Sequence, residues 1–196
     1  MVGIGVFKAM VHTLTVYLHL IAACSAIGVI LISDLKLSTY FFNSSSEDKH
    51  PDIHLEIKII IASLAVLWAT GLLLVLQGIA VNPEYLHNQK LQAKIILVII
   101  LTINAFALHL VSLPRIFNFD QHDEFAKTVL PASISNSIWF YAAFLGVARH
   151  WNFSESLTFV LSVWVMIWIV AFATMYILIR MAKSRRLKLE AASVAY

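Results

Sequence analysis

The stretch VHTLTVYLHLIAACSAIG, residues 11–28, is apolar enough to cross a membrane, and yet it carries two histidines. His12 and His19 are seven positions apart, so on a helix they project from one face, about 10 Å apart along its axis. Ionisable side chains at membrane depth are costly in free energy and tend to mark a functional site. The stretch therefore predicts a membrane-spanning helix and raises the question of what two histidines do on one face.

Composition places the chain in a membrane rather than in water. Of its 196 residues, 60% are hydrophobic and 13% are charged, and the mean hydropathy is +0.83. Soluble domains are about 45–50% apolar and about 25% charged. The apolar runs are long and lack the period-two alternation of a membrane β-barrel. The sequence therefore predicts an all-α integral membrane protein.

A helix needs about 20 apolar residues to cross a hydrocarbon core of about 30 Å. Five segments meet this requirement and predict a bundle of five transmembrane helices, approximately Phe7–Ile32, Ile57–Val81, Ala93–Leu113, Pro131–Val147 and Leu157–Ile179. The fourth segment is the weakest candidate because it opens on the polar run ASISNS, and we expect it to face protein rather than lipid. The linkers are short and polar, and residues 114–131 before the fourth segment are expected to include a short amphipathic piece at the membrane surface.

The basic segment RMAKSRRLKLE, residues 180–190, holds five of the 14 Lys and Arg residues and follows the fifth span. Under the positive-inside rule this segment stays cytoplasmic, and five spans then place the amino terminus outside. We expect a single transmembrane domain, residues 1–182, and a basic cytoplasmic tail, residues 183–196, in a bacterial inner membrane. A basic juxtamembrane segment is commoner than a nucleic-acid patch, so no nucleic-acid partner is expected.

Two intramembrane histidines, His19 and His109, lie on helix faces lined by small side chains. Such faces suit close helix packing, with the histidine hydrogen-bonded across the interface. They also suit a slot for a flat macrocycle whose iron takes a neutral imidazole from each wall, at depths that differ by about 6 Å. This second interpretation predicts one haem b between His19 and His109, with Arg115 near its propionates. The small residues are Thr15, Ala22, Ala23 and Ala26 in the first span and Thr102, Ala105 and Ser112 in the third.

A second group of histidines is expected at the outer face, with Lys94 and Arg149 nearby. Three imidazoles can bind zinc or copper, and two can ligate another haem with the cations on its propionates. Simple solvation is the competing interpretation. The three outer residues are His12, His87 and His150, while the remaining histidines, expected to be solvated in polar loops, are His50, His54 and His122.

Other residues predict architecture rather than chemistry. Asn104 and Asn136 inside spans predict interhelical hydrogen bonds, with quinone contacts as the alternative, and Gly71 and Gly78 suit tight packing. The single cysteine, Cys24, excludes an intramolecular disulfide and a cysteine-based zinc or iron–sulfur centre. The sequence contains no nucleophile elbow, phosphate loop, HExxH motif or paired-carboxylate pattern.

Three stretches carry a resemblance to known proteins: YLHLIAACSAIGVILISDLKLS at residues 17–38, TGLLL at 70–74 and YLHNQKLQAKIILVIILT at 85–102. They resemble a loose group of small bacterial inner-membrane proteins that includes the copper-resistance D type proteins and the HemJ-type membrane protoporphyrinogen oxidase. Similarity to the HemJ type implies a haem b ligated through His19 and a functional lysine at Lys94.

These observations predict a membrane-embedded haem b protein that acts in electron transfer or a redox step beside a larger redox or respiratory partner. The competing class is non-enzymatic: a copper-handling or structural membrane subunit whose histidines pack or bind metal. The pattern does not decide between an enzyme and a binding protein, and it indicates no oligomeric state.

Overall fold

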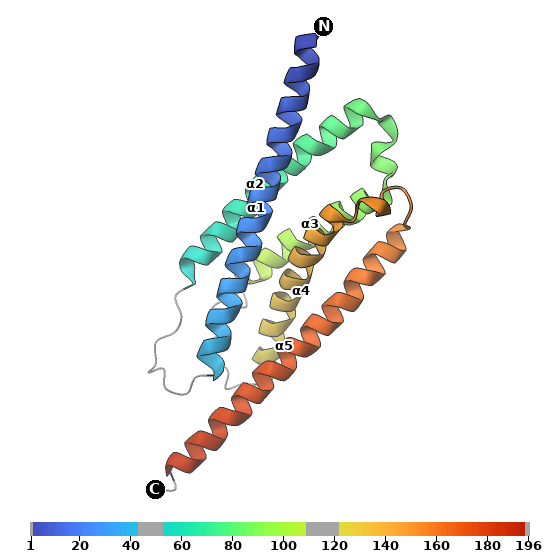
Figure 1. Cartoon of the computed structure of the whole chain (residues 1–196). Helices are drawn as coiled ribbons and strands as arrows, with labels where there is room; N and C mark the ends of the chain where they lie inside the picture. The colour runs from blue at the N-terminus through green and yellow to red at the C-terminus, as the bar shows by residue number, and fades with distance from the viewer. Residues whose placement is uncertain (1, 43–52, 109–121, 195–196) are drawn as a thin grey trace.

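The computed structural model describes residues 2–42, 53–108 and 122–194, and Figure 1 shows them as a bundle of long helices. Within these ranges five helices are long and apolar enough to cross a membrane, as the sequence predicts. The two chain ends lie at opposite ends of the bundle in Figure 1. The elements are α1 (Val2–Phe42), α2 (His54–Val81), η1 (Pro83–His87), α3 (Gln89–Ala107), α4 (His122–Val147), η4 (Arg149–Trp151) and α5 (Leu157–Val194).

The first and last helices extend beyond their predicted ends. α1 continues from Ile32 to Phe42 because this segment contains no glycine or proline to stop it. α5 runs without a break past Ala182 to Val194, since its Lys, Arg, Leu, Glu and Ala residues are strong helix formers. The basic segment is therefore a continuation of the fifth helix and not a separate piece of chain.

The third and fourth helices begin earlier than predicted. α3 begins at Gln89 because the Asn88 side chain accepts a hydrogen bond from the backbone nitrogen of Lys90 at 3.1 Å, which caps the first turn. α4 begins at His122, so part of the predicted surface segment is helical and Pro131 lies inside the helix. The rest of that segment, and the end of the predicted third span beyond Leu108, lie outside the described residues.

α4 is the most enclosed of the five helices, as expected from its polar start. In its apolar window 39% of the residues are buried, against 6% to 28% in the other four helices. It contacts α1, α3 and α5. Its buried side chains Ile138, Trp139, Tyr141 and Leu145 pack in one core with residues of α1, α3 and α5. The polar residues that weaken its hydropathy therefore face protein.

Three hydrogen bonds join α4 to α5 at positions four residues apart on each helix. Because the α4 positions ascend while the α5 positions descend, the bonds fix an antiparallel register between the two helices. Each of these three indole or phenol groups donates to an acceptor inside the bundle, because the hydrocarbon core of a bilayer offers no water as an acceptor. The bonds run from Trp168 Nε1 to Ser133 Oγ at 3.3 Å, from Trp164 Nε1 to Ser137 Oγ at 3.2 Å and from Tyr141 Oη to the Val160 carbonyl at 2.7 Å.

Both intramembrane asparagines make interhelical hydrogen bonds, which confirms the packing interpretation. Asn104 of α3 donates to the carbonyl of Pro131 in α4 at 2.7 Å. Asn136 of α4 donates to the carboxylate of Asp34 in α1 at 2.7 Å. Near the same end of α1, Lys36 pairs with the buried carboxylate of Glu56 in α2.

Gly78 allows the turn after α2 to fold back against that helix. A Cβ atom at this position would overlap the ring of Tyr85 in η1. The backbone nitrogen of Asn82, which follows α2, donates to the Gly78 carbonyl at 2.9 Å and closes the helix. The aromatic ring of Tyr85 therefore occupies the space that a side chain at position 78 would need.

We expect Gly78→Ala to lower the free energy of unfolding of the purified protein by about 1–2 kcal/mol, because the Tyr85 ring must leave its position. The double variant Gly78→Ala with Tyr85→Ala should recover part of this loss. Gly28→Ala is the matched control, since a Cβ there meets nothing within 4 Å and alanine favours a helix. Equal destabilisation by the two single variants would contradict the contact.

Candidate functional site

The two histidines of the opening stretch both hydrogen-bond to α2. His12 Nδ1 lies 2.7 Å from Gln77 Oε1, and His19 Nδ1 lies 2.8 Å from Thr70 Oγ1. The partners are seven residues apart on each helix, and the order is reversed between them. The two hydrogen bonds therefore fix the register of α1 against α2 as an antiparallel pair, and the seven-residue spacing of the histidines matches that of their partners.

The bond to Thr70 favours a proton on Nδ1 of His19. The Thr70 hydroxyl donates its only hydrogen to the Val66 carbonyl at 2.6 Å, so towards His19 it acts as an acceptor. In this arrangement His19 Nδ1 is the donor. In the neutral ring the lone pair lies on Nε2, which makes no hydrogen bond to a described residue.

Small residues around His19 are mostly covered by protein. Thr15, Ala22 and Ala26 are buried, and the Cε1 atom of His19 lies 3.6 Å from the Cβ position of Gly71. His19 itself stays partly exposed. A flat ligand at His19 would therefore approach from the exposed side of the ring and not along the face of small residues.

Lys94 is the α3 residue that the structure brings near His19, close enough for its charge to act on the ring. Its side chain is partly buried and makes no hydrogen bond or ion pair with any residue that the structure describes. Lys94 in turn experiences the charge of Lys90, one helical turn earlier, and Lys90 experiences the charge of Arg149. His19 therefore lies at one end of a row of cations.

The predicted partner His109 and the predicted propionate contact Arg115 lie outside the described residues, so their roles stay predictions. Between Lys94 and Ala107 the helix α3 advances about 20 Å. Within the described part of α3, the ionisable group at the level of His19 is therefore Lys94.

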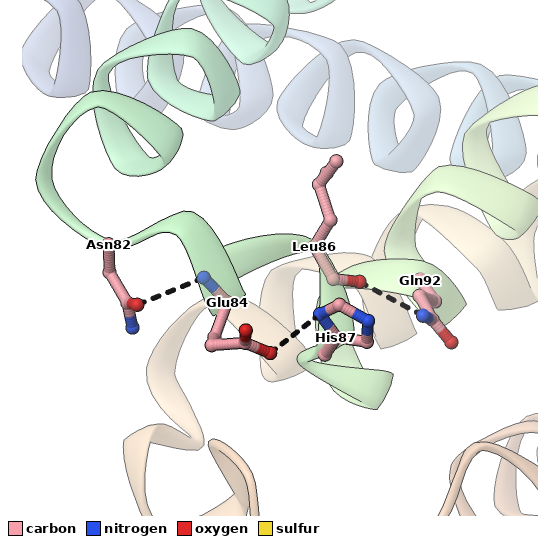
Figure 2. Close-up of polar contacts among 5 residues, drawn as sticks. All are labelled: Asn82, Glu84, Leu86, His87 and Gln92. Atoms are coloured by element: carbon pink, nitrogen blue, oxygen red, sulfur yellow. Dashed lines mark hydrogen bonds and ion pairs between the residues drawn. The ribbon is translucent and has the colours of Figure 1, made fainter.

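The predicted outer histidines take part in three separate contacts. His12 bonds Gln77, while His150 packs edge-on against Trp151 with ring centroids 5.9 Å apart. Figure 2 shows the third, His87, whose Nδ1 lies 2.9 Å from a Glu84 carboxylate oxygen on the exposed turn η1. No group of three His, Cys, Asp or Glu residues in the described ranges could hold a metal ion. The predicted copper or zinc site has no support from these contacts.

The other predicted loop histidines divide between the described and undescribed parts of the chain. His54 is exposed at the first position of α2. His122 opens α4 rather than lying in a loop, and His50 lies outside the described residues. Neither His54 nor His122 adds a described contact to the site around His19.

Sequence reasoning identified His12 and His19 but missed their acceptors. Gln77 and Thr70 show the same spacing of seven as the two histidines, with the order reversed. Matching polar spacings on consecutive spans would have predicted both bonds, because consecutive helices joined by a short loop run antiparallel.

No protein-family model, curated protein or solved structure matches this chain.

We expect a double-mutant cycle between His19→Ala and Thr70→Val to give a coupling free energy of about 0.6 kcal/mol, the average for hydrogen bonds between membrane helices, and at most about 1.7 kcal/mol. Unfolding in mixed micelles, monitored by circular dichroism, measures each variant. The matched control is the cycle between His12→Ala and Thr70→Val, which joins residues of different bonds and should show no coupling. Equal coupling in both cycles would contradict a specific bond from His19 to Thr70.

Proposed function

We propose that this chain is a membrane-embedded haem b protein that acts in electron transfer or a redox step beside a larger partner. The observation that supports it is the 2.8 Å hydrogen bond between His19 Nδ1 and Thr70 Oγ1, which leaves Nε2 without a bond to a described residue. A metal-ligating histidine typically anchors its other nitrogen in this way, which orients the ring. Bound haem would supply one-electron chemistry.

The residues around His19 fit a haem in two respects. A neutral imidazole nitrogen is the usual axial ligand of haem iron, and haem carries anionic propionates that need cationic partners. Lys94, which lacks a described carboxylate partner, provides such a cation near His19. We propose Lys94 as a propionate contact. Because α3 carries the chain about 20 Å past Lys94 by Ala107, the sequence-based assignments of His109 as the second ligand and Arg115 as a further contact require the chain after Leu108 to return towards His19.

A structural role is the second candidate, and the paired bonds of α1 with α2 favour it. His12 and His19 each satisfy a polar group of the neighbouring helix in the same register. Histidines that serve only to align two spans would show the same contacts and need no cofactor. The two candidates differ in one observable property, the absorption spectrum of the protein.

We further propose a bacterial inner-membrane location with the amino terminus outside and the carboxyl end of α5 in the cytoplasm. The basic residues near the end of α5 support this orientation through the positive-inside rule. The positions of the chain ends at opposite ends of the bundle are compatible with five spans (Figure 1).

We expect protein purified in mild detergent, after expression with adequate haem supply, to show a Soret band that sharpens and shifts to the red on reduction with dithionite. His19→Ala and His109→Ala should remove this spectrum or convert it to high spin, because each removes an axial ligand. His12→Ala is the matched control, since it removes the equivalent bond to α2 from the same helix face.

Substitutions at His50 and His122 should also leave the spectrum intact. A colourless wild-type protein, or a spectrum that survives both His19→Ala and His109→Ala, would contradict the haem proposal. Either result would leave the structural role as the better account of the two histidines in α1.

For the orientation, we expect alkaline phosphatase fused after Tyr196 to be inactive and a green fluorescent protein fused there to fluoresce. The phosphatase folds only outside the reducing cytoplasm, because it needs disulfides. Active phosphatase together with a dark fluorescent fusion would reverse the proposed orientation.

A further inference from the structure

An open aromatic pocket of about 520 Å³ lies along α4, η4 and α5. Trp151 is one of the lining residues and makes edge-to-face contacts with Phe144 and Phe159 at centroid distances of 5.3 and 5.5 Å. Phe140, Phe144 and Phe159 expose between 42% and 47% of their surface, so the pocket opens outward from the bundle. Its volume falls within the range of about 300–1,000 Å³ that ligand pockets occupy.

Cationic side chains lie beside this apolar pocket. The carbonyl of Ala148 accepts two hydrogen bonds, from Lys90 Nζ at 2.7 Å and from the backbone nitrogen of Trp151 at 3.2 Å. The ammonium of Lys90 therefore lies next to the backbone of Trp151, which lines the pocket. Arg149, which lies between Ala148 and Trp151 in the sequence, is exposed and close enough for its charge to act on Lys90.

These two cations retain unused hydrogen-bond donors. Lys90 is 4% exposed, and the bond to Ala148 uses one of its three N–H groups. The Arg149 guanidinium has five donors and makes no side-chain bond to a described residue. Neither side chain forms an ion pair with a carboxylate in the described ranges. A buried lysine beside a second cation is unfavourable unless an anion compensates the charge.

We propose that the pocket holds an acyl chain of an anionic phospholipid, whose phosphate is bound by Lys90 and Arg149. The apolar lining and the outward opening on two membrane-spanning helices favour a hydrocarbon chain from the bilayer. The charge at the pocket's end favours an anionic headgroup, because Arg binds phosphate through paired donors and Lys adds a point charge. This inference does not rest on the haem proposal, and it uses neither His19 nor Lys94.

The test measures which lipid occupies the pocket of the full-length protein. Nanodiscs of phosphatidylcholine are prepared with a small fraction of either phosphatidylglycerol or phosphatidylcholine that carries bromine on its acyl chain, and tryptophan fluorescence is recorded. Brominated phosphatidylglycerol should quench more strongly at equal mole fraction, because it concentrates beside Trp151. Trp151→Phe should remove the excess quenching by phosphatidylglycerol. The four remaining tryptophans should then be quenched equally by the two lipids.

Arg149→Gln should lower the preference for phosphatidylglycerol over phosphatidylcholine by about tenfold, as expected for loss of charge-assisted hydrogen bonds. Its matched control is Lys8→Gln, which removes an exposed cation from α1. Phe144→Ala should weaken binding of both lipids, whereas Phe106→Ala, at an exposed aromatic of α3, should not. Thermal unfolding of each variant confirms that the fold is retained.

Equal quenching by the two brominated lipids would overturn the proposal, as would an equal effect of Lys8→Gln and Arg149→Gln. Displacement of the lipid by millimolar glycerol phosphate would show that the cations recognise a soluble phosphate rather than a lipid. Because the readout is lipid binding, a failure here is distinct from a failure of the haem spectrum.

Discussion

The absence of water from the bilayer core governs this structure, since a polar group within a span must find its partner inside the protein. Serine and threonine hydroxyls meet this requirement by donating to a carbonyl of their own helix, as Thr15 does to Val11 at 2.8 Å. Larger polar side chains must reach another helix. Trp139 Nε1 is the exception among the fully buried nitrogen and oxygen atoms of the described side chains, because it has no hydrogen-bond partner.

This requirement explains why the helix pairs have a defined register. Apolar contacts tolerate sliding of one helix along another, because lipid and side chains are similarly apolar. A hydrogen bond between two particular side chains does not tolerate it. The two bonds from α1 to α2 and the three from α4 to α5 repeat at helical intervals, so a shift of either pair would break every bond in its set.

Much of this arrangement follows from the sequence, and the rest depends on partners that a single helix does not reveal. Hydropathy predicted the five spans, and the polar residues of ASISNS predicted that α4 faces protein. The helix ends were less predictable, because membrane thickness limits the apolar stretch but does not stop the helix, as α1 and α5 show. The polarity before Pro131 predicts that the fourth span starts there, whereas Pro131 lies within α4 and its carbonyl accepts a hydrogen bond from the Asn104 amide.

The candidate site likewise combines residues that the sequence identifies with partners that only the packing of the helices reveals. His19 stood out because a histidine is conspicuous in an apolar run, whereas Thr70 is an ordinary residue until its position opposite His19 is known. Lys94 is predicted from the sequence by its place at the start of a span and by the resemblance to the HemJ type. Its proximity to His19 depends on the packing of α3 near α1, which no spacing within one helix encodes.

The charges of α3 impose a final constraint on function. Lys90 and Lys94 lie one turn apart, and like charges at this spacing destabilise a helix. Arg149 adds a third positive charge, and none of the three has a carboxylate partner among the described residues. An anion that binds this row would stabilise the folded protein, because a ligand specific for the native state shifts the folding equilibrium towards it. The proposed haem propionates near His19 and the proposed lipid phosphate near Arg149 would occupy different ends of this row, so binding of one would not prevent binding of the other.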